Sequence, residues 1–175
     1  MKDCPPVCFV KSLIVTEKKI GGVVPADLER FAERARRAAG LSGEVNILIT
    51  SDAELRRLNR AFRHKNKATD VLSFPATSSG IAGDIAISAD TAARSARFLA
   101  HSLADELKVL IVHGMLHLAG HDHESDNGEM ARKETRLRGK LGLPQGLIQR
   151  TVSGQANVPG PQRARKTVPR RRTPV

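Results

Sequence analysis

Four of the six histidines of this 175-residue chain lie between His113 and His123. His113 and His117 are four residues apart, so on a helix their side chains share one face, about 6 Å apart along the axis. Gly120 can end such a helix with a positive φ and turn the chain back, which lets His123 reach the same point. The spacing therefore predicts a metal site with three neutral nitrogen ligands and a fourth position left for water or substrate, as in catalytic zinc sites.

The remaining histidine of the cluster, His121, is ambiguous. It could be a spare donor, a group that hydrogen-bonds behind a ligand, or a substrate contact, and we do not assign it as a ligand. Asp70, Asp84 and Asp122 are candidate hydrogen-bond partners for the ligand rings. Asp70 could equally cap a turn, and Asp84 could equally begin a strand.

An ion held by three neutral imidazoles keeps its full positive charge. That charge lowers the pKa of bound water towards about 7 and polarises a phosphoryl oxygen, which suits phosphodiester hydrolysis. Metzincin peptidases have the same histidine spacing, but a glutamate follows their first histidine as the general base. This chain has Gly114 at that position, which weakens a peptidase interpretation without excluding it.

The elements that must position these residues can be predicted from apolar periodicity and capping signals. Ser51 with Glu54, and Ser102 with Asp105, have the spacing at which a serine caps a helix. The order of the predicted elements, βαβαββααα, indicates an α+β domain with a small mixed sheet packed against about five helices. The strands are expected at 7–15, 44–50, 69–75 and 83–87. The helices are expected at 25–39, from 51 through Phe62, at 90–99, from 102 through His117, and at 126–141. Leu55, Leu58 and Phe62 are expected to be the apolar residues of the second of these helices.

The formal net charge is +11, and residues 150–175 contribute +7 of it without a single acidic residue. With four prolines and no apolar period, this segment is predicted to be a disordered basic tail after a flexible N-terminus (1–6) and one domain (7–149). The tail either adds salt-sensitive affinity for phosphate backbones or only solubility. Cys4 and Cys8 are expected to be free thiols of a cytoplasmic protein with no membrane segment.

Two further motifs precede the histidines. The chain reads Thr-Asp-Val-Leu-Ser-Phe-Pro at 69–75 and Gly-Asp-Ile at 83–85, ahead of His-Gly-Met-Leu-His-Leu-Ala-Gly-His-Asp-His at 113–123. With these motifs in this order, the chain resembles the YbeY family of metal-dependent endoribonucleases over about residues 7–142. The resemblance implies a zinc-dependent, single-strand-specific endoribonuclease that acts in 16S ribosomal RNA 3′ end maturation and in ribosome quality control.

Taken residue by residue, the resemblance implies that His113, His117 and His123 hold one zinc ion per chain. It also implies a catalytic role for Arg63, which would pair with phosphate oxygens where charge builds in the transition state. The implied partners are single-stranded regions of ribosomal RNA, the ribosome or its small subunit, and assembly factors. Two alternatives stay open, a metzincin-like metallopeptidase and a non-catalytic ribosome assembly factor with a structural metal. Further side chains either contact the RNA backbone or form a solvated face: Arg56, Arg57, Arg60, Lys65 and Lys67.

Overall fold

The computed structural model describes residues 12–18, 20–123 and 126–144. Cys4, Cys8, the predicted N-terminal segment and the basic tail lie outside the described residues, so the expectations for them stay predictions. Within the described part, the elements follow the predicted order. They are β1 (Leu13–Thr16), α1 (Pro25–Ala38), β2 (Glu44–Thr50), α2 (Asp52–Arg63), β3 (Val71–Pro75), β4 (Ile81–Ser88), α3 (Ala89–Phe98), α4 (Leu103–Leu118) and α5 (Glu129–Leu141).

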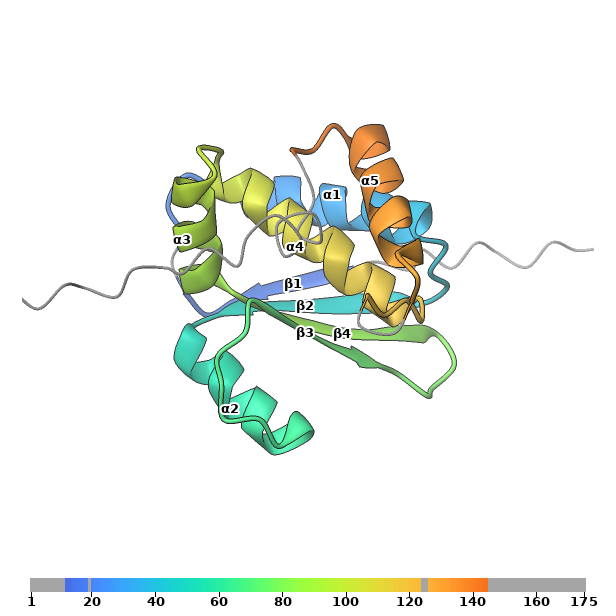
Figure 1. Ribbon diagram of the computed structural model, residues 1–175, viewed down its shortest axis with the longest axis horizontal. Coiled ribbons are helices and arrows are strands. Elements are labelled where there is room, and N and C mark those ends of the chain that lie inside the picture. The colour runs from blue at the N-terminus through green and yellow to red at the C-terminus, as the bar shows by residue number, and fades with distance from the viewer. Residues whose placement is uncertain (1–11, 19, 124–125, 145–175) are drawn as a thin grey trace, which may run out of the picture.

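The four strands form one mixed sheet in the order β1-β2-β4-β3. β1 and β4 both run parallel to β2, whereas β3 pairs antiparallel with β4 and forms an edge of the sheet. Figure 1 shows α1, α3, α4 and α5 over one face of this sheet and α2 alone on the other. The predicted α+β fold with a small mixed sheet and five helices is therefore confirmed.

The main hydrophobic core lies between the sheet and the four helices that cover it. Alternation along β2 turns Val45, Ile47 and Ile49 into this core, and each is at most 1% exposed. α4 is buried on almost every side, from Glu106 to Leu116. A helix packed in this way holds the side chains at its end in a fixed geometry.

The predicted serine caps are present. The Ser51 hydroxyl accepts the backbone N–H of Glu54 at the start of α2, and the Ser102 hydroxyl accepts that of Asp105 at the start of α4. No helix in the described part of the chain is long and apolar enough to cross a membrane.

Two local expectations were wrong. α5 begins at Glu129 rather than near Asp126, because Gly128, in the left-handed region, precedes the first turn, and the Asp126 carboxylate accepts the backbone N–H groups of Gly128 and Met130. Phe62, expected on the apolar side of α2, is 65% exposed, because that face of the sheet carries only a small cluster around Leu55, Leu72 and Ala86.

Candidate metal and nucleic-acid site

The three predicted ligands come together at the end of α4. Ligand nitrogens of His113, His117 and His123 all lie within 4.8 Å of one another, and Nε2 of His113 is 3.2 Å from Nε2 of His117. Zinc–nitrogen bonds of about 2.1 Å at tetrahedral angles place nitrogens about 3.4 Å apart. The three rings can therefore hold one metal ion with small adjustments of their side chains.

The end of α4 explains how His123 joins the other two rings. The helix closes with backbone hydrogen bonds from Gly120 N to His117 O (3.0 Å) and from His121 N to Leu116 O (3.0 Å), the pattern of a Schellman motif. Gly120 has a φ of +84°, which a residue with a side chain rarely adopts. This turn reverses the chain and returns His123 to the face that carries His113 and His117.

A buried carboxylate from α5 fixes the orientation of the first ring. Oε2 of Glu134 lies 3.0 Å from Nδ1 of His113, and both side chains are buried. Because the carboxylate accepts a hydrogen bond, Nδ1 carries the proton and the lone pair is on Nε2, the atom that faces His117. The other Glu134 oxygen accepts a hydrogen bond from Nη1 of Arg138 at 3.1 Å.

The second ring is held in its neutral form. Burial lowers the pKa of His117, and the neighbouring His113 and His123 rings lower it further, to about 4. A ring with this pKa is unprotonated at neutral pH, so its lone pair is available to a metal ion.

Arg63 reaches the same place from the opposite face of the sheet. It is the last residue of α2, and its Nη2 donates a long hydrogen bond of 3.4 Å to the carbonyl oxygen of Ser73 on edge strand β3. The Ser73 hydroxyl donates in turn to the carbonyl oxygen of Gly114 on α4, at 3.1 Å. Ser73 therefore connects the helix that carries Arg63 to the helix that carries His113 and His117.

The histidines and Arg63 line one hollow of about 850 Å³, which we call the metal-site hollow. Lys65 and Lys67, in the loop after α2, line this hollow together with Arg63. Asn59 holds this loop, because its buried side chain donates to the carbonyl oxygen of Lys67 at 2.7 Å. A metal site faced by three cations suits a polyanionic substrate.

Gly114 has a structural reason to be glycine. A Cβ at this position would lie 2.8 Å from Cγ2 of Ile85 and 3.2 Å from the hydroxyl of Ser73. α4 therefore packs directly on the sheet at the position where a metzincin peptidase carries its general base, and a glutamate has no space there.

The other polar candidates are placed differently from one another. Asp70 accepts the N–H of Val71 (2.9 Å) and the hydroxyl of Thr69 (3.1 Å) just before β3, and it lines the metal-site hollow without a hydrogen bond to any of the described histidine rings. Asp84 accepts a hydrogen bond from Asn46, is exposed and lies outside the metal-site hollow. Asp122 lines that hollow, and its charge opposes the lowering of the pKa of His117.

His121 also lines the metal-site hollow, but its Nε2 lies 2.9 Å from Nζ of Lys133. A lysine ammonium only donates, so this nitrogen accepts that hydrogen bond and is occupied.

Two residues of the site, Ser73 and Glu134, were not predicted from the sequence. Ser73 lies inside the motif at 69–75, whereas nothing in the sequence distinguishes Glu134 from the other charged residues of α5.

Comparisons with known protein families and with individual proteins point to the same family. A model of the family described as "Endoribonuclease YbeY" matches residues 11–142. The chain is 59% identical over 140 residues to a protein of Koribacter versatilis named endoribonuclease YbeY, and the alignment covers 80% of this chain and 92% of the relative. It is 53% identical over 126 residues to the protein of that name in Solibacter usitatus, covering 72% of this chain and 85% of the relative.

Among solved structures, the solution structure of TM1509 from Thermotoga maritima matches with a TM-score of 0.54 and 28% identity. The match covers 74% of this chain and 88% of that one. With a family match across most of the described residues and relatives of such high identity, this chain belongs to the YbeY family of endoribonucleases.

Proposed function

We propose that this protein is a zinc-dependent endoribonuclease that hydrolyses phosphodiester bonds in single-stranded regions of ribosomal RNA. The observation that carries the proposal is the group of three histidine rings that lie together in a hollow with a basic wall. Family membership supports RNA as the substrate, since the relatives are named endoribonucleases. We extend the proposal to 16S 3′ end maturation and ribosome quality control in the cytoplasm, with the small subunit and assembly factors as partners.

In the proposed mechanism, His113, His117 and His123 hold one zinc ion. A zinc ion supplies a Lewis acid that polarises a phosphoryl oxygen and activates water near neutral pH. Glu134 keeps the proton on Nδ1 of His113, so the ligand nitrogen of that ring stays free to bind.

Arg63 acts on the substrate side of the hollow. Its guanidinium is oriented by the Ser73 carbonyl and retains further N–H donors for two oxygens of the cleaved phosphate, where negative charge builds in the transition state. Lys65 and Lys67 hold neighbouring phosphates by charge. Their exposure suits an RNA strand that lies along the edge of β3.

The test is cleavage of a single-stranded ribosomal RNA fragment by the zinc-loaded protein, with bound zinc quantified for every variant. His117→Ala should lose both zinc and cleavage, whereas Arg63→Ala should keep zinc and cut poorly. The matched controls are His121→Ala, which should keep zinc, and Arg34→Ala, an exposed arginine of α1, which should keep cleavage.

Two results would overturn the proposal. A wild-type protein that holds zinc but cuts no RNA, with or without ribosomal subunits, would favour the assembly factor with a structural metal. Zinc-dependent cleavage of casein in place of RNA would favour a peptidase, although Gly114 leaves that reaction without its usual base.

A further inference from the structure

A second hollow, of about 470 Å³, adjoins the metal-site hollow. We call it the α2–α3 hollow, because Asn59 of α2 and Thr91 and Arg94 of α3 line it but not the metal-site hollow. The two hollows share five lining residues, so a chain molecule bound at the metal site can continue into the second hollow. The shared residues are Arg63, Lys65, Lys67, Thr69 and Asp70.

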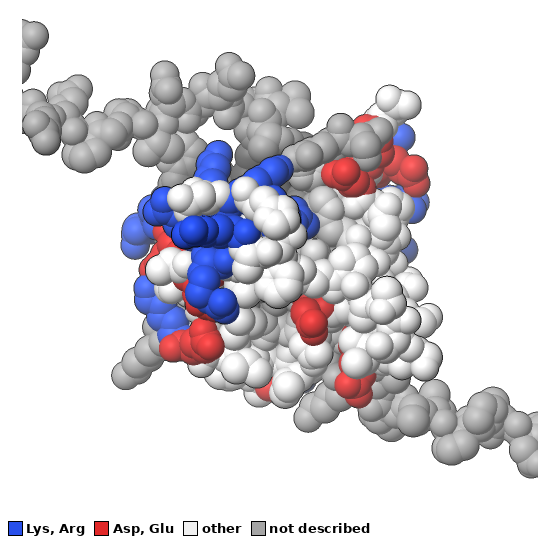
Figure 2. Space-filling view, turned by 90° about the horizontal axis from the view of Figure 1, so that it is seen from below, with Lys and Arg blue, Asp and Glu red and all other residues white. Residues whose placement is uncertain are grey.

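The α2–α3 hollow is strongly basic. Arg63, Lys65, Lys67 and Arg94 line it against the single carboxylate of Asp70. Within the described residues, the side chains of Lys65 and Lys67 take part in no hydrogen bond or ion pair, so their charges are available to a ligand. Figure 2 shows lysine and arginine side chains gathered on one side of the face of the molecule that is seen from below.

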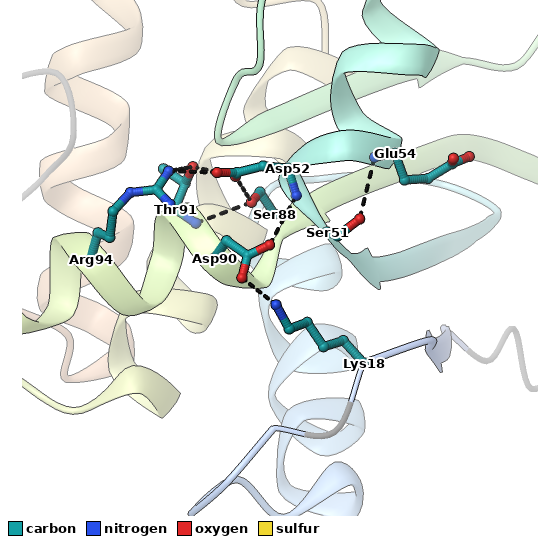
Figure 3. Close-up of polar contacts among 8 residues, drawn as sticks. All are labelled: Lys18, Ser51, Asp52, Glu54, Ser88, Asp90, Thr91 and Arg94. Carbon is teal, nitrogen blue, oxygen red and sulfur yellow. Dashed lines mark hydrogen bonds and ion pairs between the residues drawn. The ribbon is translucent and has the colours of Figure 1, made fainter.

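Arg94 is held in place by the first turn of α2 (Figure 3). Its Nη2 donates to Oδ2 of Asp52 at 2.8 Å and to the hydroxyl of Thr91 at 2.8 Å. Asp52 also accepts hydrogen bonds from the hydroxyls of Ser88 and Thr91, so the carboxylate is itself fixed. The guanidinium is therefore oriented before any ligand binds.

This arrangement leaves donors of Arg94 unused. A guanidinium has five N–H donors, and in the described part of the chain only those on Nη2 form hydrogen bonds. The remaining donors, on Nε and Nη1, lie on different edges of the guanidinium, and each can donate a charge-assisted hydrogen bond to a phosphate oxygen. The side chain is 56% exposed, so a ligand can reach these donors.

We propose that the α2–α3 hollow binds the backbone phosphate of a nucleotide that flanks the cleaved bond. Arg94 is its oriented contact, and the RNA strand runs along edge strand β3 from the histidines to α3. This inference rests on the proposed endoribonuclease function and adds the path of the substrate. It makes Arg94 a residue for substrate binding with no part in metal binding.

The test compares Arg94→Gln with Arg97→Gln. Both variants remove one exposed positive charge from the same helix, but Arg97 lines neither hollow. The full-length zinc-loaded protein is titrated with a single-stranded RNA made resistant to cleavage, across a series of salt concentrations. Each phosphate contact with a single strand contributes about 0.7 to the slope of log K against log salt.

We expect Arg94→Gln to weaken RNA binding roughly tenfold and to reduce the salt slope by about 0.7, with bound zinc unchanged. Arg97→Gln should change the slope by much less. Ala68→Glu places a carboxylate in the wall of the α2–α3 hollow alone, and it should weaken binding in the same way. It serves as the second variant if Arg94→Gln loosens the contact between α2 and α3, which a thermal unfolding curve would reveal.

Replacing single phosphates of the RNA by neutral methylphosphonates locates the contact. At one position that flanks the cleaved bond, the replacement should weaken RNA binding by the wild-type protein and leave RNA binding by Arg94→Gln unchanged. The inference is overturned if Arg94→Gln and Arg97→Gln behave alike, or if no single phosphate is coupled to Arg94. In either case a wild-type protein that cuts RNA leaves the proposed function intact, whereas a wild-type protein that cuts no RNA overturns both.

Discussion

Replacing Glu134 tests how the ligand geometry is built. The carboxylate is 1% exposed and accepts hydrogen bonds from Nδ1 of His113 (3.0 Å) and Nη1 of Arg138 (3.1 Å). Glu134→Gln keeps the shape of the side chain and removes its charge, so His113 becomes a weaker and less well-oriented ligand. Loss of a hydrogen-bond partner behind a metal ligand costs about 10- to 100-fold in metal affinity, and we expect zinc binding to weaken by that amount.

The same residue also contributes to folding. Glu134→Ala leaves the Arg138 guanidinium, 2% exposed, without this carboxylate. Removing one member of a buried ion pair costs about 3–5 kcal/mol in the free energy of unfolding. Replacing both members, as in Glu134→Leu with Arg138→Met, should recover most of that stability and leave zinc binding weak. The double variant thus separates the role in folding from the role in orienting His113.

Two measurements decide the outcome. Zinc affinity is measured by competition with a chromophoric chelator, and the stability of the metal-free protein by urea unfolding. Glu129→Gln, 56% exposed on the same helix, is the control and should bind zinc within about twofold of wild type. The reasoning is refuted if Glu134→Gln binds zinc as tightly as wild type, or if the double variant regains full affinity.

Three further predictions concern packing, pH and the basic loop. Gly114→Ala should lower the free energy of unfolding by about 1–3 kcal/mol in urea, because its Cβ would meet Ile85 at 2.8 Å; an unchanged midpoint would contradict this. Burial by itself would raise the pKa of the Asp52 carboxyl group. The hydrogen bonds that this carboxylate accepts, first that from Ser88, outweigh burial and lower its pKa in the folded protein. The ionised Asp52 therefore stabilises the fold at pH values above the ordinary pKa of aspartate, and this contribution is lost as the pH falls through the pKa of the folded protein. Asp52→Asn should be less stable than wild type near neutral pH, and the difference in the free energy of unfolding should shrink in acid. Asn59→Ala should release the loop at Lys67 and weaken RNA binding several-fold with zinc binding intact, and a parallel loss of zinc would argue against that role.

The sequence by itself determined most of the local structure. Ser51 and Ser102 identify the starts of α2 and α4, because each cap bond joins residues only three apart. Alternation placed β2 at its observed bounds, since burial on one face requires a period of two residues. The spacing of His113, His117 and His123 likewise predicted that these three side chains come together, because one helix end and its closing turn position all three rings.

Only the tertiary structure decided which residues surround that group. Glu134 lies 21 residues from His113 in the sequence, and it is the packing of α5 against α4 that brings the two together. The site also required Ser73 on an edge strand to connect Arg63 below the sheet with Gly114 above it. Such contacts depend on how helices pack on a sheet, which is set by side-chain volumes across the whole core. A local periodicity records which face of an element is buried, but it does not record which residue of another element lies against it.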